Sequence, residues 1–329
     1  MILVCGEALI DLFVGDDDGT ALAARAVPGG SPFNVAIALA RLGRPAGFCG
    51  GLSTDRFGEV LAGRLTRDGV DVSLAPRLSA PTTIGVVAPR PNGDVSYAFH
   101  GHGAADRSIG GADLPATLPD GVRALAFGSF SLAVDPAGAA YLALAQREAG
   151  RRVVSLDPNL RAMVTPDLAA WRARLAEFLA VADIVKASAE DLADGFGIDP
   201  VDAAALTAWA EGRLAGGARL VVTTLGSAGA RAFLRTPRGT AMRAVAGRRV
   251  RVADTVGAGD TLHAALLARL DARGLLDRAG LETLSPDDVA DALDFAVRAA
   301  SITCERPGAN PPTLAEVEAR GASPAAQGR

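Results

Sequence analysis

Two aspartates flank a glycine-rich turn in the segment DTVGAGDT, residues 254–261. Gly257, Ala258 and Gly259 would let backbone N–H groups converge at the start of the helix that follows, and a helix N-terminus of this kind attracts anions. Asp260 would then be a carboxylate inside an anion site, which is unfavourable unless the carboxylate has a task. Accepting the proton of a hydroxyl group that attacks phosphorus is such a task. The alternative is a structural turn in which Asp260 caps the helix.

Lysine is almost absent from the chain, and the familiar lysine-containing nucleotide motifs are missing with it. Lys186 is the only lysine, and its segment DIVKASAED does not end a glycine-rich loop as a Walker-type lysine does. The VAIK and HRD motifs of protein kinases are absent from the sequence. The first predicted strand opens onto GEALID instead of a G-x-G-x-x-G turn, which excludes a Rossmann dehydrogenase. A nucleotide would need a different architecture, in which Lys186 is either a ligand or part of a salt bridge.

Composition and charge narrow the class of protein further. The 329 residues carry a formal net charge of -4, whereas a nucleic-acid-binding protein would need a basic face. Cys5, Cys49 and Cys304 lie too far apart for a metal-binding pattern or a disulfide framework, so we expect reduced thiols and a cytoplasmic protein. The N-terminal segment is too short and too acidic for a signal peptide, and no apolar run reaches about 18 residues. No membrane contact is expected.

Short β-rich apolar runs alternate with Ala/Leu-rich helical segments along most of the chain. Helices are predicted over 34–43 and 57–69, each ended by a glycine, and strands over runs such as VRALAFGS and ARLVVTTLG. This alternation predicts a parallel, doubly wound sheet, in which ligands bind at the carboxyl ends of the strands. GEALID, DPNLR, KASAED and TTLGSAG all stand at those ends.

Two segments, at about 12–30 and 82–105, break the alternation because each contains two strands joined by a turn. The second carries the turn PNGD, which is typical of a hairpin. The two segments are either separate surface hairpins or one small sheet that forms a lid over the strand ends. We expect a single domain over 1–329 that ends in a disordered tail at 322–329.

Three segments stand in order along the chain: GEALIDL, PGGSPFNVAIALARLG (28–43) and DTVGAGDTLHAALL. Together they resemble the two signature regions of the ribokinase-like (PfkB) carbohydrate kinases, and the resemblance extends over nearly the whole chain. Within that family, SYAFHGHGAADR, LDPNLR, KASAEDL and TCERPGANPP are most similar to the bacterial fructokinases. The resemblance implies a three-layer α/β/α sandwich with a central, mainly parallel sheet and a small β-sheet lid. It also implies ATP-dependent transfer of a phosphoryl group to a primary hydroxyl of a monosaccharide, with D-fructose as the first candidate.

The resemblance assigns roles residue by residue around the reacting groups. Asp260 would be the base that deprotonates the sugar hydroxyl. The other residues implied at the phosphoryl group are Gly257, Ala258 and Gly259, through their backbone amides, and Arg161. Those implied at the sugar are Asp11, Gly29, Gly30, Asn34 and, as an apolar cover, Phe99. The roles of His100 and His102 stay open, and His263 lies beyond the amide cluster and so cannot replace the base.

The resemblance also implies MgATP and a monovalent cation, usually K⁺. Ser188 and Asp191 stand where the family has an asparagine and a glutamate that organise Mg²⁺-bound water and phosphate. The neighbouring Glu190 is an alternative to Asp191. Further residues implied at the nucleotide are Thr223, Gly226, Gly229, Ala309 and Asn310. Those implied at the monovalent cation are Asp254, Val256, Thr303, Arg306 and Gly308.

Two other functions remain open at this stage. A 2-keto-3-deoxygluconate kinase, or another PfkB sugar or nucleoside kinase, shares the motifs. The ketodeoxygluconate carboxylate would need an arginine from the lid, yet Arg107 stands only at the far end of YAFHGHGAAD. A non-catalytic sugar- or nucleotide-binding module should lose the base, whereas Asp260 is present. The implied partners are a small sugar and ATP, with no nucleic acid or membrane, and a homodimer could form through the lid.

Overall fold

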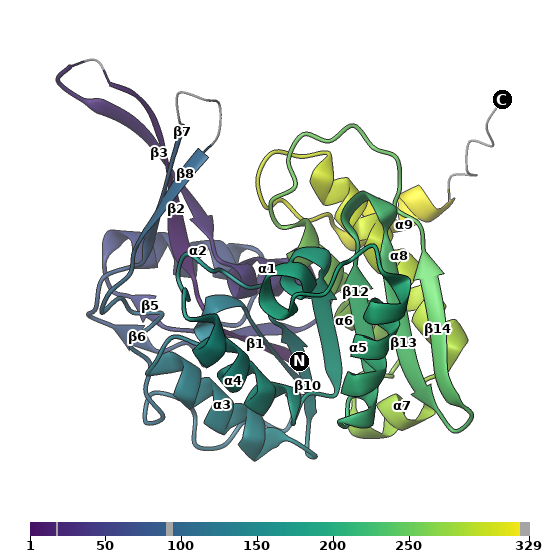
Figure 1. The fold of residues 1–329 in the computed structure, drawn as a ribbon. Helices are drawn as coiled ribbons and strands as arrows, with labels where there is room; N and C mark the ends of the chain where they lie inside the picture. Colours follow the sequence, from purple (N-terminus) through teal and green to yellow (C-terminus); the bar gives the residue numbers. More distant parts are fainter. Residues whose placement is uncertain (18, 90–94, 323–329) are drawn as a thin grey trace.

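The structure is a computed structural model that describes residues 1–17, 19–89 and 95–322 (Figure 1). An eight-stranded sheet lies at its centre. Six neighbouring strands run parallel, and two antiparallel strands extend one edge. In spatial order the strands are β14 (Gly239–Val245), β13 (Ala230–Thr236), β12 (Leu220–Thr224), β11 (Ile184–Ser188), β10 (Val153–Asp157), β9 (Ala124–Gly128), β1 (Ile2–Cys5) and β4 (Ala46–Cys49).

Helices cover both faces of this sheet, as Figure 1 shows. Each strand therefore buries both of its faces: in β1, Ile2 and Val4 pack in one hydrophobic cluster and Leu3 and Cys5 in the other. The first cluster includes residues of α1 (Ser31–Arg41), α2 (Arg56–Arg67), α6 (Ala258–Ala272), α7 (Arg278–Thr283), α8 (Pro286–Cys304) and α9 (Leu314–Ala322). The second includes α3 (Ala137–Glu148), α4 (Leu168–Leu179) and α5 (Ala203–Ala215). The predicted three-layer α/β/α fold is confirmed. No helix within the described ranges is long and apolar enough to span a membrane.

The two segments that break the helix–strand alternation pair into one small sheet, which projects from the main body in Figure 1. Its order is β3 (Leu22–Gly29), β2 (Leu9–Asp17), β7 (Ile84–Pro89) and β8 (Val95–His100). Strand β2 pairs antiparallel with β3 and parallel with β7, so it joins the two hairpins. The prediction of one small sheet is therefore correct. The turn PNGD and the tail 323–329 lie outside the described residues.

The helix that follows the glycine-rich turn, α6, begins at Ala258, inside the turn itself. Its N-cap is Gly257, whose φ of +77° lies in the left-handed region that suits glycine. Asp260 is therefore the third residue of α6, and it does not serve as the N-cap. This placement frees its carboxylate to face other parts of the chain.

Two short strands, β5 (Leu52–Ser53) and β6 (Arg77–Leu78), form a separate parallel pair beside α2. Helix α2 begins at Arg56, one residue before its predicted start, because Asp55 caps it and accepts the amide of Gly58 at 2.7 Å. The same carboxyl group accepts the amide and the hydroxyl of Thr82, just before β7. Asp55 therefore ties the base of the small sheet to the main body.

Candidate active site

A cleft of about 750 Å³ opens at the carboxyl ends of the central strands, on the side that carries the small sheet. This is the position expected for a ligand in an open α/β sheet. Most of the residues that the sequence nominated line it. They are Asp11, Gly30, Asn34, Phe99, Arg161, Ser188, Asp191, Gly226, Gly229, Val256, Gly257, Ala258, Gly259 and Asp260.

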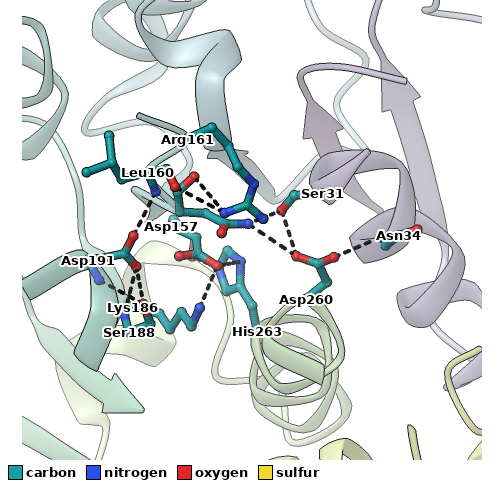
Figure 2. Close-up of polar contacts among 12 residues, drawn as sticks. Ser31, Asn34, Asp157, Leu160, Arg161, Lys186, Ser188, Asp191, Asp260 and His263 are labelled. Atoms are coloured by element: carbon teal, nitrogen blue, oxygen red, sulfur yellow. Dashed lines mark hydrogen bonds and ion pairs between the residues drawn. The ribbon is translucent and has the colours of Figure 1, made fainter. Parts of the chain in front are cut away.

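Asp260 is held in one orientation by side chains from two other parts of the chain (Figure 2). Its Oδ1 accepts a hydrogen bond from Ser31 Oγ at 2.7 Å, and its Oδ2 accepts one from Asn34 Nδ2 at 2.9 Å. Asn159 Nδ2 donates to Ser31 Oγ at 2.8 Å and lies 3.5 Å from Asp260 Oδ1. Ser31 was missed by the sequence analysis, although its place between the paired glycines and Asn34 is a signal.

The glycine-rich turn packs against the C-terminal segment at Gly257. A Cβ on Gly257 would lie 2.7 Å from the side chain of Ala309, so only glycine fits there. The amide of Ala258 donates to the carbonyl of Thr255 at 3.2 Å, and the amide of Thr261 donates to that of Gly257 at 2.8 Å. The first helical turn leaves further N–H groups without a partner inside the helix, as every helix start does.

Asp11 lies at the small-sheet end of the cleft, between two glycines. A Cβ would fall 2.5 Å from its Oδ2 if placed on Gly29 and 3.0 Å from its Oδ1 if placed on Gly85. Gly29 thus makes room for this carboxylate and does not itself line the cleft. Burial raises the pKa of Asp11 to about 6, while the charge of Arg161 acts to lower it. The sequence analysis missed Gly85, because Gly85 is brought beside Asp11 only by the pairing of β2 with β7.

Apolar rings and a buried acid complete this end of the cleft. Phe99 and Phe130 both line it and meet edge to face, with ring centroids 6.4 Å apart. Glu7, which is 1% exposed, also lines it, and burial raises its pKa to about 7. His100 and His102 are exposed and do not line the cleft.

Asp191 and Glu190 have different environments. Asp191 Oδ1 accepts the amide of Leu160 at 2.7 Å, and its Oδ2 accepts both the amide and the hydroxyl of Ser188 at 2.8 Å. Asp191 is 4% exposed and begins the π-helix η2 (Asp191–Gly195), whereas Glu190 is exposed and also lines the cleft. The Asp191 carboxylate therefore joins the ends of β10 and β11.

Only some of the residues that the resemblance assigns to the nucleotide line the cleft. Gly226 and Gly229 line the cleft, but Thr223 is fully buried in β12 and Thr224 takes the position beside them. Asn310 is turned away, because its Oδ1 accepts a hydrogen bond from Arg41 Nη1 at 2.7 Å. The loop between β14 and α6 also contributes cleft residues that the sequence analysis did not select: Gly247, Arg248, Arg249, Val250, Val252 and Thr255.

The two segments nominated for a monovalent cation lie side by side. Asp254 accepts the amide of Val256 at 3.0 Å and that of Gly308 at 2.8 Å, and its own amide donates to Cys304 at 3.2 Å. Thr303 Oγ1 donates to Thr261 Oγ1 at 3.0 Å, whereas the Arg306 guanidinium turns outward to Glu316. Each oxygen of Asp254 accepts one amide, whereas the two oxygens of Asp191 accept three donors, so the Asp254 carboxylate keeps lone pairs that suit a hard cation. Within the described ranges no cluster of three or more His, Cys, Asp or Glu residues is arranged to hold a metal ion.

His263 lies in α6 one turn after Asp260 and is 1% exposed. Its Nε2 is 2.7 Å from the hydroxyl of Ser155, inside the layer between α6 and the sheet. Burial, together with the charge of Lys186, lowers the pKa of His263 to about 3. A neutral, enclosed imidazole fits the expectation that His263 is not the base.

The chain is similar in sequence and in fold to known carbohydrate kinases. The protein-family model described as "pfkB family carbohydrate kinase" matches residues 1–316 of this chain. A fructokinase of Rhizobium leguminosarum bv. trifolii is 43% identical over 284 residues, which cover 86% of this chain and 84% of the relative. The structure of a fructokinase with bound ATP from Xylella fastidiosa superposes with a TM-score of 0.84 at 29% identity and covers 97% of both chains. A fructokinase double mutant from Vibrio cholerae O395, in a form with bound fructose, ADP and potassium ion, has a TM-score of 0.77 at 27% identity and also covers 97% of both chains.

Proposed function

The chain belongs to the pfkB family of carbohydrate kinases, and we propose that it transfers the γ-phosphoryl group of ATP to a primary hydroxyl group of D-fructose. The observation that carries this proposal is the position of Asp260. Its carboxylate lies at the start of α6, beside the glycine amides, and faces Asn34 in the same cleft as Asp11. One residue thus adjoins both a site for hydroxyl groups and a site for phosphate. The fructokinases similar to this chain over most of its length support fructose as the sugar.

In the proposed reaction Asp260 accepts the proton of the attacking hydroxyl. The new sugar O–P bond forms as the bond between the γ-phosphorus and the bridging oxygen breaks, and ADP leaves with the bonding electrons. Ser31 and Asn34 hold the carboxylate in place through hydrogen bonds of 2.7 and 2.9 Å, so little reorganisation is needed. Asp11 accepts hydrogen bonds from other sugar hydroxyls. The exposed guanidinium of Arg161 reaches the phosphates from the loop after β10.

A ketodeoxygluconate kinase is the second candidate, and the position of Arg107 counts against it. The Arg107 guanidinium lies 4.8 Å from the centroid of the Phe130 ring and does not line the cleft, so Phe130 separates it from a sugar. Coupled measurement of ADP release across fructose, 2-keto-3-deoxygluconate, ribose and adenosine tests the choice. We expect kcat/KM for fructose to be at least about tenfold above the others. A higher value for ketodeoxygluconate would replace fructose as the substrate.

We propose that Glu190, and not Asp191, serves the network of Mg²⁺-bound water, because three hydrogen bonds already occupy the oxygens of Asp191. Glu190→Gln is expected to raise the MgATP concentration at half-maximal rate about tenfold and to leave Tm unchanged. Asp191→Asn should mainly lower Tm by a few degrees, because its amide would face the donors of Ser188 or Leu160. Titrations of rate against MgATP and thermal melts distinguish the two. The reverse pattern would assign the network to Asp191.

We propose that Asp254, with carbonyls of the segment that contains Thr303, Arg306 and Gly308, holds a monovalent cation. Bound K⁺ would place positive charge beside the phosphate site. Replacing K⁺ by a large organic cation is expected to lower kcat about tenfold, and Asp254→Asn should make the rate insensitive to K⁺. The measurement is initial rate against K⁺ concentration at fixed ionic strength. A flat titration of the unaltered enzyme would remove the cation from the proposal.

A further inference from the structure

A buried lysine lies directly beneath the glycine-rich turn. Lys186 comes from β11, its side chain is 3% exposed, and it lines the cleft. A Cβ placed on Gly259 would fall 3.3 Å from Lys186 Nζ, so the ammonium group touches the first turn of α6. The strand therefore brings to the phosphate site the lysine that the turn itself lacks.

A single ion pair holds this ammonium in place. Lys186 Nζ, from the middle of β11, donates to Asp157 Oδ2, at the end of β10, at 2.9 Å (Figure 2). The same oxygen is 4.0 Å from His263 Nδ1. An ammonium group has three donors. Among the described residues, Lys186 Nζ makes this one hydrogen bond, which leaves two donors for a ligand.

The surrounding charges favour a cation here. Burial alone would lower the pKa of Lys186, but the charges of Asp157, Asp191 and Asp260 outweigh it and raise this pKa above its usual value. Burial raises the pKa of Asp157 to about 7, although Lys186 opposes the rise. Asp157 Oδ1 has no hydrogen-bond partner within the described part of the chain, so this ion pair is not fully satisfied as a structural element.

We propose that Lys186 is a catalytic residue, whose ammonium contacts the γ-phosphoryl group during transfer, and that Asp157 is the positioning residue that holds it there. The proposal rests on the kinase function proposed above. Lys186 keeps its proton throughout, because the proton of the sugar hydroxyl goes to Asp260. The ammonium group stabilises negative charge on the transferred group from a dry site, where such an interaction is strongest.

Kinetics of paired variants separate this role from a structural ion pair. Lys186→Met is expected to lower kcat about 10²- to 10³-fold while KM for fructose stays within about threefold. The double variant Lys186→Met/Asp157→Asn removes both charges and avoids an unpaired buried carboxylate. It should keep a Tm near that of the unaltered enzyme and be equally slow. A folded double variant with kcat within about threefold of the unaltered enzyme would overturn the proposal.

The single lysine also gives a direct readout. Protein made with ¹⁵N-labelled lysine side chains contains one Nζ group, that of Lys186. We expect its resonance to shift when Mg²⁺, ADP and beryllium fluoride are added, because beryllium fluoride occupies the γ-phosphoryl position. ADP with Mg²⁺ alone should move it much less. Equal shifts in the two mixtures would contradict the contact. This experiment needs no sugar, so it separates failure of the inference from failure of fructose as substrate.

A methyl group at position 259 provides a second test. Gly259→Ala would place a carbon 3.3 Å from Nζ, closer than an ordinary contact of about 3.5–4.0 Å, and would displace the ammonium. We expect Gly259→Ala to lower kcat about tenfold in the unaltered enzyme but to have little effect in the Lys186→Met background. Gly63→Ala, in the interior of α2 with nothing within 4 Å of its added carbon, is the matched control and should leave kcat unchanged. Additive effects of Gly259→Ala and Lys186→Met would contradict the coupling.

Discussion

Asp260→Asn is expected to lower kcat for sugar phosphorylation by about 10²- to 10⁴-fold, the range that a positioned general base contributes. An amide cannot accept the hydroxyl proton, so the attacking oxygen would remain neutral. ATP binding should be nearly unchanged, because the amides at the start of α6 and the residues around Gly226 stay in place. Single-turnover kinetics and a binding titration with ATP measure the two effects separately.

The fold should tolerate this substitution because its neighbours can adapt. The asparagine oxygen would accept the hydrogen bond of Asn34 Nδ2, and its amide could donate to the hydroxyl of Ser31, which is free to rotate. Asp271→Asn is the matched control on the same helix. Asp271 is 7% exposed and pairs with Arg44 at 2.5 Å, away from the cleft, so its loss should lower Tm and leave kcat within about threefold. An Asp260→Asn enzyme of ordinary activity would show that another group is the base.

The location of the site follows from sequence alone, whereas the identity of its neighbours often does not. Parallel strands all end at one edge of a sheet, so GEALID, DPNLR and KASAED had to converge there. When two adjacent residues are of the same type, the sequence does not show which of them faces the site. Thr223 and Thr224 point to opposite faces of β12, and only the packing of that strand decides which one faces the cleft.

Long-range contacts explain the remaining differences. The carboxylate of Asp191 accepts a hydrogen bond from the amide of Leu160, 31 residues away, which the sequence pattern does not show. The carboxylate of the neighbouring Glu190 is the one left exposed in the cleft. Asn310 is drawn to Arg41 by a contact between α1 and the C-terminal segment. Lys186 is the clearest example. Its sequence segment allowed two roles for this lysine, a ligand contact or a salt bridge. The structure shows the salt bridge to Asp157, and it also places Lys186 Nζ beside Gly259 in the glycine-rich turn.

Asp11→Asn is expected to raise KM for fructose about 10- to 150-fold, because hydrogen bonds to a charged acceptor contribute about 1.5–3 kcal/mol. The carboxylate lies in a gap between Gly29 and Gly85, where sugar hydroxyls can approach it closely. The chemical step should be affected less, since Asp260 and the glycine amides are separate from this end of the cleft. Steady-state rates at varied fructose concentration and saturating MgATP give both constants.

The same carboxylate predicts a pH dependence. Burial raises the pKa of Asp11 to about 6, so lowering the pH through this value protonates the group and removes its charged acceptor. The kcat/KM for fructose should therefore fall about tenfold per pH unit below about pH 6, and Asp11→Asn should flatten that limb. Arg161→Met removes the charge that lowers the pKa, so it should move the limb to higher pH. An acid limb that is unchanged in both variants would mean that another group controls it.

Linkage gives an independent check on Asp11. Its pKa in the folded protein, about 6, is above the value of 3.8 for a free aspartate, so the folded state binds the proton more tightly. The stability associated with protonated Asp11 is fully present below the unfolded pKa and is lost as the pH rises through about 6. Asp11→Asn should therefore raise Tm at pH 7.5, where the native carboxylate is charged and half-buried, and change it less near pH 4. A substitution that stabilises the protein while weakening sugar binding would identify Asp11 as a residue kept for its ligand. A lower Tm at pH 7.5 would instead mark it as part of the small sheet's own structure.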